Sequence, residues 1–292
     1  MNKWMAVMLA GVVPFAWGEG LLEYSAPMDQ SEWRLASDSP LECRLEHTIP
    51  GYGQGAFVSR SGKKVNLDFE LAPYRQNVRQ QSVTLRAIPP LWRPGQAEQG
   101  ISTIRFYAQF DGLVDGQAAW TMLSDLERGF YPSFLFKDWY HRGQSVRVSL
   151  SSVGFPSRYQ AFLSCLNNLL PYTFEDIAFS VLNYESNSDR LTPYSQRRLE
   201  QIAEYVKADT TIDLILLDAY TDSYGGSWTN QQLSDKRAAA LKAFFVQQGV
   251  PAERLQVDGH GEKQHIASNQ TEVGRQTNRR VVISMEKFLP PI

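Results

Sequence analysis

The sequence predicts an α+β protein with a β-rich N-terminal domain and a C-terminal α/β domain. Its 292 residues are enough for two domains of ordinary size. From about residue 41 to 153, short segments alternate apolar and polar residues, as half-buried strands do. After Pro171, strand-like segments alternate with longer helical ones, which is typical of helices layered on a sheet. We therefore place the domain boundary near residue 171, with domains over 19–171 and 172–292.

The N-terminal domain is expected to be a barrel or a sandwich with two helices. Residues 64–71 alternate apolar and polar side chains, and residues 82–88, 102–110 and 145–153 follow the same pattern. Stretches rich in glycine and proline separate these strands. The two helices are expected over 117–129, which ends at Gly129, and over 158–170, just before Pro171.

The C-terminal domain is expected to have the element order β-α-β-α-β-β. Residues 174–185 read as a strand, with the acidic pair Glu175 and Asp176 capping the domain entry. Thr192 and Pro193 are suited to the N-cap and first position of a helix that runs to about residue 207. Residues 212–220 form a continuous apolar run, which indicates a central strand. A helix over 229–248 and strands over 254–261 and 279–285 complete the domain.

The N-terminus has the pattern of a secretory signal peptide over residues 1–18. Lys3 precedes an apolar run from Trp4 to Ala16, and the small residues around Gly18 provide a cleavage site. The run is shorter than the roughly 20 helical residues that span a bilayer. The alternatives are a buried N-terminal helix and a membrane anchor. Cleavage after Gly18 would place the mature protein outside the cytoplasm.

Export makes the two cysteines, Cys43 and Cys165, candidates for a disulfide. A pair of cysteines in an oxidising compartment commonly forms a bridge, and loop-closure entropy over this separation would stabilise the fold by about 4–5 kcal/mol. The alternative is two buried thiols. The net charge of −2 provides no broad surface for nucleic acid. The four histidines form no metal-binding pattern and no nucleophile motif is present, so we expect no enzyme activity and no cofactor.

Arg237 is the most unusual residue of the C-terminal domain. It falls in the apolar stripe that a helix would turn toward the sheet, which is formed by Leu233, Ala240, Leu241 and Phe244. A guanidinium there is costly unless an anion accepts its hydrogen bonds, and its planar fork suits a carboxylate. The sequence therefore predicts an anionic partner for Arg237.

Asp222 follows the predicted central strand, on the turn before this helix. Ligands of α/β sheets commonly lie at the carboxyl ends of strands. In one interpretation Asp222 and Arg237 pair with each other or with nearby polar groups. In the other, they flank a site for a zwitterion, with Asp222 binding an ammonium group and Arg237 a carboxylate.

The segments "YTDSYGG", "TNQQLSDKRAAAL", "GHGE" and "NRRVVI" occur in that order across residues 174–286. This stretch resembles the OmpA-like peptidoglycan-binding domain shared by OmpA, Pal and MotB. The resemblance implies that Asp222 and Arg237 hold the ammonium and the carboxylate of diaminopimelate in the stem peptide. It also implies that the same groove is lined by Thr221, Asn230, Leu233, Asn278 and Arg280. The sequence departs from the family at Ala219-Tyr220 and at His265, which flank the site.

The segments "PLEC", "KKVNLDFEL", "PPLWRPG" and "SSVGF" extend the likeness to the N-terminal domain. With both cysteines, they resemble the MotY family of sodium-type flagellar motor proteins. This resemblance implies a non-enzymatic periplasmic protein of the flagellar basal body, in the T ring. Its N-terminal domain would join the basal body and the partner MotX, and the ring would help to hold PomA/PomB stator units around the rotor. Trp92, in the proline-rich loop, is a candidate for a partner contact.

The alternative is an OmpA-type outer-membrane protein with a wall-binding tail. Its N-terminal half would need about eight strands of roughly 10 residues with outward-facing apolar bands. The helix over 117–129, the disulfide and the charge-rich strands argue against this alternative.

Overall fold

The computed structural model describes residues 20–64, 66–138, 143–185, 188 and 190–287. The predicted signal peptide over 1–18 lies outside these residues. The N-terminal region contains β1 (Leu22–Ser25), β2 (Trp33–Asp38), β3 (Glu42–Ile49), β4 (Gly53–Arg60), β5 (Asp68–Pro73), β6 (Gln81–Ile88), β7 (Gln99–Phe106), β8 (Gly112–Asp115), α1 (Gly116–Glu127), β9 (Tyr131–Lys137), β10 (Ser145–Ser149) and α2 (Phe155–Asn167). The strands and helices expected from the sequence are therefore confirmed as β5, β6, β7, β10, α1 and α2.

The N-terminal strands form two sheets rather than one closed sheet, with the orders β1-β10-β9-β6-β7 and β2-β3-β4-β5-β8. This is the sandwich alternative. Aromatic side chains pack between the sheets: the ring of Phe69 on β5 stacks on that of Phe134 on β9, with centroids 5.7 Å apart. Phe57 and Phe106 extend this cluster, and all four rings are buried.

The chain divides into two compact units. The first takes the described residues up to Arg34 together with Glu46–Phe57 and Asp68–Ser157, and the second takes Leu35–Leu45, Val58–Leu67 and the residues from Arg158 onward. The second unit thus contains most of α2 and parts of β2, β3 and β4 as well as the α/β region. The domain boundary near residue 171 stays a prediction.

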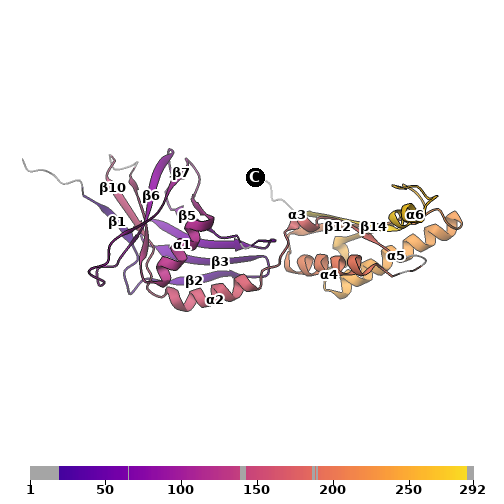
Figure 1. Ribbon diagram of the computed structural model, residues 1–292, viewed down its shortest axis with the longest axis horizontal. Coiled ribbons are helices and arrows are strands. Elements are labelled where there is room, and N and C mark those ends of the chain that lie inside the picture. The colour runs from indigo at the N-terminus through magenta and orange to yellow at the C-terminus, as the bar shows by residue number, and fades with distance from the viewer. Residues whose placement is uncertain (1–19, 65, 139–142, 186–187, 189, 288–292) are drawn as a thin grey trace, which may run out of the picture. The chain divides into compact units, whose positions relative to one another are not determined.

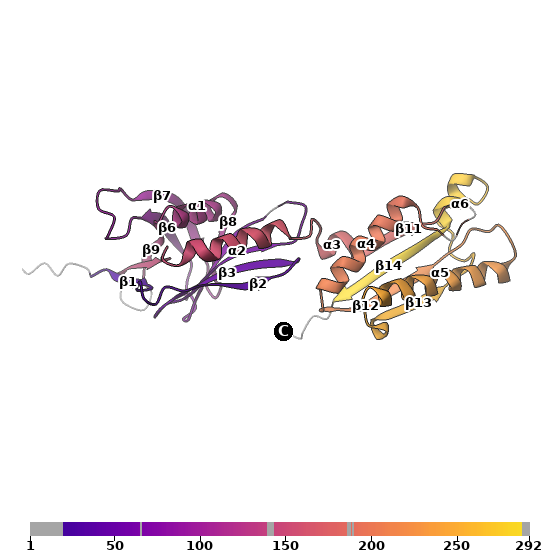
Figure 2. The same ribbon diagram turned by 90° about the horizontal axis from the view of Figure 1, so that it is seen from below.

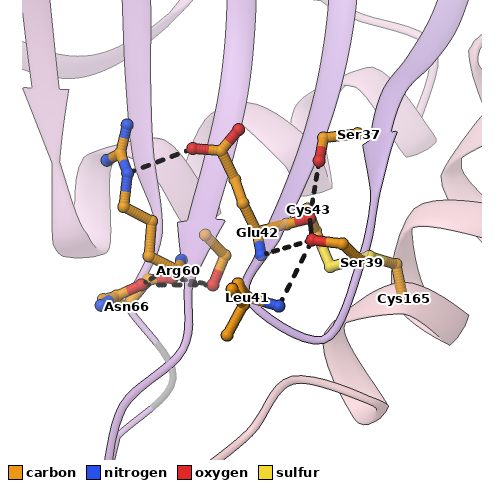
Figure 3. The surroundings of a disulfide bond; sticks show 9 residues. Ser37, Ser39, Leu41, Glu42, Cys43, Arg60, Asn66 and Cys165 are labelled. Atoms are coloured by element: carbon orange, nitrogen blue, oxygen red, sulfur yellow. Dashed lines mark hydrogen bonds and ion pairs between the residues drawn. A yellow bond between two sulfur atoms is a disulfide. The ribbon is translucent and has the colours of Figure 1, made fainter. Parts of the chain in front are cut away.

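Cys43 on β3 and Cys165 on α2 form the expected disulfide, with Cα atoms 5.9 Å apart (Figure 3). Both cysteines are buried. The hairpin turn before Cys43 is fixed by the Ser39 hydroxyl, which accepts hydrogen bonds from the backbone N–H groups of Leu41 and Glu42. This turn fixes the start of β3, so that the Cys43 side chain meets the helix.

The C-terminal region contains α3 (Phe174–Ile177), β11 (Phe179–Asn183), α4 (Pro193–Ala208), β12 (Ile212–Ala219), α5 (Ser227–Gln247), the 3₁₀ turn η1 (Ala252–Arg254), β13 (Leu255–Gly259), α6 (Glu272–Asn278) and β14 (Arg280–Lys287). The sheet has the order β11-β14-β12-β13, so β12 is an interior strand as predicted. The helices α4 and α5 cover one face of this sheet (Figures 1 and 2). Thr192 caps α4 by accepting a hydrogen bond from the Ser195 N–H, also as predicted.

The strand expected over 174–185 is wrong in its first part, because residues 174–177 form the helix α3. The reason is a capping box. The Thr173 side chain accepts from the Asp176 N–H, and the Asp176 carboxylate accepts from the Thr173 N–H. Asp176 therefore does cap the entry, but it begins a helical turn before β11.

Among the described residues, no helix is both long and apolar enough to cross a membrane.

His47, in the core of the first unit, makes stability depend on pH. Its Nδ1 donates to the Glu32 carbonyl at 3.0 Å, and its Nε2 accepts from the Ser151 N–H at 3.3 Å. Burial lowers the pKa of this imidazole to about 4, although the backbone hydrogen bond to Glu32 raises it. Because the unfolded pKa is near 6.5, the neutral ring contributes fully above pH 6.5, and this contribution is lost as the pH falls toward 4.

We therefore expect the free energy of unfolding to fall by about 3 kcal/mol between pH 6.5 and pH 4 through His47 alone. Denaturant titrations followed by circular dichroism over this range would measure the loss. In the His47→Phe variant, which has no titrating group here, this part of the pH dependence should disappear. An identical slope in both proteins would contradict the assignment.

Candidate functional site

A cleft of about 580 Å³ lies beyond the carboxyl end of β12. It is lined by Ser188, Thr221, Asp222, Tyr224, Asn230, Leu233, Arg237, Glu272, Arg275 and Arg279. Five of the seven predicted site residues are therefore brought together, namely Thr221, Asp222, Asn230, Leu233 and Arg237. Among the described residues, the lining combines two carboxylates with three guanidinium groups, so both signs of charge face one small volume.

Asp222 is held with both carboxylate oxygens engaged. Oδ1 accepts from the Tyr224 N–H at 3.0 Å, which closes a tight turn, and Oδ2 accepts from Arg279 Nη1 at 2.7 Å. The preceding residue is also fixed, because the Thr221 N–H donates to the Gly261 carbonyl at 2.8 Å. Asp222 is buried and its position is defined by backbone groups from two loops.

Arg237 lies in the buried stripe of α5, with 4% of its surface exposed, as the sequence predicted. The stripe itself differs from the predicted one. Its buried members are Asn230, Ser234, Arg237, Ala238, Leu241 and Phe245. Ala240 is exposed, and Leu233 and Phe244 are half-buried. The buried face of α5 is therefore turned slightly away from the predicted apolar stripe. Polar residues occupy the first half of this buried face, next to the cleft.

The guanidinium of Arg237 contacts Ser188 and Tyr184. Nη2 donates to the Ser188 carbonyl at 3.0 Å, and the guanidinium carbon lies 4.1 Å from the centroid of the Tyr184 ring. A cation over an aromatic face is stabilised electrostatically, and the flat ring orients the planar group. Arg237 is therefore held in one orientation at the wall of the cleft.

Arg279 is a site residue that the sequence analysis did not select. It is buried, and it connects Asp222 to Glu272, whose Oε1 accepts from Arg279 Nη2 at 2.8 Å. Glu272 Oε2 also accepts from Arg275 Nη2 at 2.6 Å. Burial acts to lower the pKa of Arg279, but the Glu272 and Asp222 carboxylates more than offset it and raise that pKa. The two arginines lower the pKa of Glu272 to about 2. This chain of ion pairs fixes the charge state of one wall.

The glycines of the "GHGE" turn allow α5 to approach the sheet closely. A Cβ atom on Gly259 would lie 2.6 Å from the backbone nitrogen of Asp235, so no larger residue fits there unless α5 shifts. Gly261 has a φ of +59° and its N–H donates to the Ser234 hydroxyl at 2.9 Å. Glu262 then accepts from Asn230 Nδ2 at 2.9 Å. The turn thereby ties the start of α5 to the end of β13.

Asn278 and Arg280 do not line the cleft. The Asn278 side chain is fully buried; it accepts from the N–H groups of Ile266 and Ala267 and donates to Ala267 O and Asn269 Oδ1. It therefore shapes the loop before α6. Arg280 donates to the Gln264 carbonyl at 3.1 Å and lies over the Tyr220 ring.

The two departures from the family pattern lie outside the cleft lining. The Tyr220 ring stacks on the His260 ring, with centroids 4.8 Å apart, and the Arg280 guanidinium lies over the same Tyr220 ring. His265 is exposed and hydrogen-bonds to Asn269.

Thr221 and Leu233 complete the cleft. The Thr221 hydroxyl is buried and has no hydrogen-bond partner among the residues that the structure describes. A buried polar atom of this kind is costly unless a ligand or water satisfies it. The half-buried Leu233 supplies an apolar wall one turn before Arg237. The cleft is therefore suited to a small molecule or side chain that carries both an ammonium group and a carboxylate on a short apolar stem.

Two families match the sequence. The MotY N-terminal domain family matches residues 24–171, and the OmpA family matches residues 183–279. The sodium-type flagellar protein MotY of Vibrio parahaemolyticus is 46% identical over 288 residues, which cover 98% of each chain. The outer-membrane lipoprotein YfiB of Pseudomonas aeruginosa is 41% identical over 100 residues, 34% of this chain and 59% of that protein.

Among solved structures, the peptidoglycan-associated lipoprotein of Burkholderia pseudomallei is 25% identical over 36% of this chain and 89% of its own, with a TM-score of 0.34. The MotY match, in contrast, runs through both halves of the chain at high identity. The chain therefore belongs to the MotY family, which is a family of flagellar motor proteins and not of enzymes, and its C-terminal part is a domain of the OmpA family.

Proposed function

We propose that this protein is a periplasmic structural component of the sodium-driven flagellar motor that holds the peptidoglycan wall through the cleft at Asp222 and Arg237. The observation that carries the proposal is the convergence of an oriented carboxylate and an oriented guanidinium in one cleft of a domain of the OmpA family. Diaminopimelate in a stem peptide presents an ammonium group and a carboxylate on the same carbon. The two charges of the cleft complement that pair.

Each charged group has a defined task in this proposal. The Asp222 carboxylate has about four acceptor positions, of which Tyr224 and Arg279 use two, so an ammonium group can be bound at the others. Arg237 binds the carboxylate through its planar fork, while the Tyr184 ring and Ser188 keep the fork in place. Arg279 and Glu272 position Asp222 and balance its charge. Binding is non-covalent and uses no cofactor.

The N-terminal domain would join the flagellar basal body and MotX within the T ring. The support is the MotY N-terminal family match over residues 24–171 and the similarity to the Vibrio protein along the whole chain. A wall-held ring of this kind would resist the torque that the rotor exerts on the PomA/PomB stator units. We do not retain the alternative of an outer-membrane protein with a wall-binding tail, since the MotY similarity covers 98% of the chain.

The test of wall binding is sedimentation of the full chain with purified sacculi. We expect the chain to pellet with sacculi that contain diaminopimelate, and free diaminopimelate to release it in a concentration-dependent way. Cadaverine, which has the same two amino groups on a five-carbon chain and lacks both carboxylates, is the matched competitor and should release much less. A chain that stays in the supernatant would contradict the proposal.

A further inference from the structure

Arg275 lines the cleft, and the function proposed above assigns it no task. It lies on α6, one turn after Glu272. Its side chain is 28% exposed, whereas that of Arg279 on the same wall is only 7% exposed. The two arginines therefore differ in their access to a ligand. Arg279 is withdrawn behind Asp222 and Glu272, and Arg275 is open to whatever enters the cleft.

The guanidinium of Arg275 is held from two sides and keeps further donors. Nη2 donates to Glu272 Oε2 at 2.6 Å, and Nη1 donates to the Asn269 carbonyl at 3.0 Å. These are its hydrogen bonds to the described residues, and a guanidinium has five N–H groups. The remaining N–H groups can therefore bind a ligand. Because the group is already oriented, a ligand would lose little binding energy in ordering it.

Among the described residues, the cleft lining carries one more positive charge than negative. The positive groups are Arg237, Arg275 and Arg279, and the negative ones are Asp222 and Glu272. A ligand group with one ammonium and one carboxylate adds no net charge, so the positive excess remains after it binds. A second carboxylate on the same ligand would balance that excess, which favours a ligand with more acid groups than the zwitterion alone.

We propose that Arg275 binds a second carboxylate of the stem peptide, in addition to the one bound by Arg237. This inference rests on the wall-binding function proposed above. A stem peptide carries further free carboxylates, one on the γ-linked glutamate that precedes diaminopimelate and one at its C-terminus. Either has the planar pair of oxygens that a guanidinium recognises. A carboxamide at the same position has no negative charge and offers one acceptor oxygen in place of two.

The test is isothermal titration calorimetry of the full chain with three soluble stem peptides that all contain diaminopimelate. The first is unmodified, the second has the glutamate carboxylate converted to a carboxamide, and the third has a C-terminal carboxamide. We expect at least one of the two amidations to weaken binding to the wild type about tenfold, since a hydrogen bond to a charged group is lost. The peptide that binds more weakly identifies the carboxylate.

The variant Arg275→Gln separates ligand binding from a supporting role. It should bind the unmodified peptide about tenfold more weakly than the wild type does, and it should no longer respond to that amidation. If Arg275 only positioned Glu272, the variant would still distinguish the peptides. Arg275→Lys keeps the charge without the planar fork and should retain part of the response. Arg197→Gln, at an exposed position of α4, is the matched control and should respond as the wild type does.

Three results would overturn the inference, and they are distinguishable. Equal affinity of the wild type for all three peptides would overturn it alone, whether or not the variants fold. An amidation effect that keeps its full size in a folded Arg275→Gln protein would also overturn it, because another group would then bind the carboxylate. Failure of the wild type to bind any of the three peptides would overturn the proposed wall-binding function as well.

Discussion

Replacing Arg237 by alanine is expected to lower the affinity for sacculi by at least about 100-fold. Removing one partner of a buried, hydrogen-bonded charge pair costs about 2–5 kcal/mol, and Arg237 lies almost fully buried at the cleft. Asp222→Ala should have an effect of the same order, because it removes the carboxylate that we propose to bind the ammonium group. Sedimentation with increasing amounts of sacculi measures both losses.

The controls separate binding from folding. Arg237→Lys keeps the charge but not the fork, so it should bind with intermediate affinity. Arg197→Ala removes an exposed arginine of α4 and should bind normally. Each variant needs a thermal unfolding curve, because Arg237 also packs on Tyr184. Folded Arg237→Ala and Asp222→Ala proteins that pellet as well as the wild type would contradict the site assignment.

Removing the disulfide is expected to destabilise the protein by about 4–5 kcal/mol, since the bridge closes a loop across 122 positions. The double variant Cys43→Ala/Cys165→Ala should therefore unfold at a clearly lower denaturant concentration. A reducing agent should shift the wild type to the same midpoint and leave the double variant unchanged. Equal midpoints for the oxidised wild type and the double variant would contradict this prediction.

Elements with a strong local signal could be predicted from the sequence. The helix cap at Thr192 and the interior strand β12 follow from the residues at those positions. The disulfide follows from the expected export of the protein to an oxidising compartment. The helix α3 at the start of the C-terminal region could not be predicted, because the capping box at Thr173 begins a helix in a segment whose composition suits a strand. Local hydrogen bonds of this kind are hard to separate from strand propensity in a short window.

Part of the cleft lining was predicted from the sequence, and part was not. Asp222 and Arg237 stand out because charges there need partners, and the structure places both at one cleft. Which residue of Asn278, Arg279 and Arg280 faces that cleft depends on where α6 ends, and the sequence analysis did not detect this short helix. The buried face of α5 also differs from the predicted apolar stripe, for a related reason. Loops from distant parts of the chain bury polar residues of this helix; for example, the Gly261 N–H donates to the Ser234 hydroxyl.

The most direct test of the account is isothermal titration calorimetry of the full chain with two soluble stem peptides. One peptide carries diaminopimelate, and the other carries lysine at the same position, which keeps the ammonium group and lacks the carboxylate. We predict that the wild type prefers the diaminopimelate peptide at least about tenfold and that Arg237→Ala loses this preference. Equal affinity of the wild type for the two peptides, or a preference that survives in Arg237→Ala, would contradict the claim that the cleft recognises both charges.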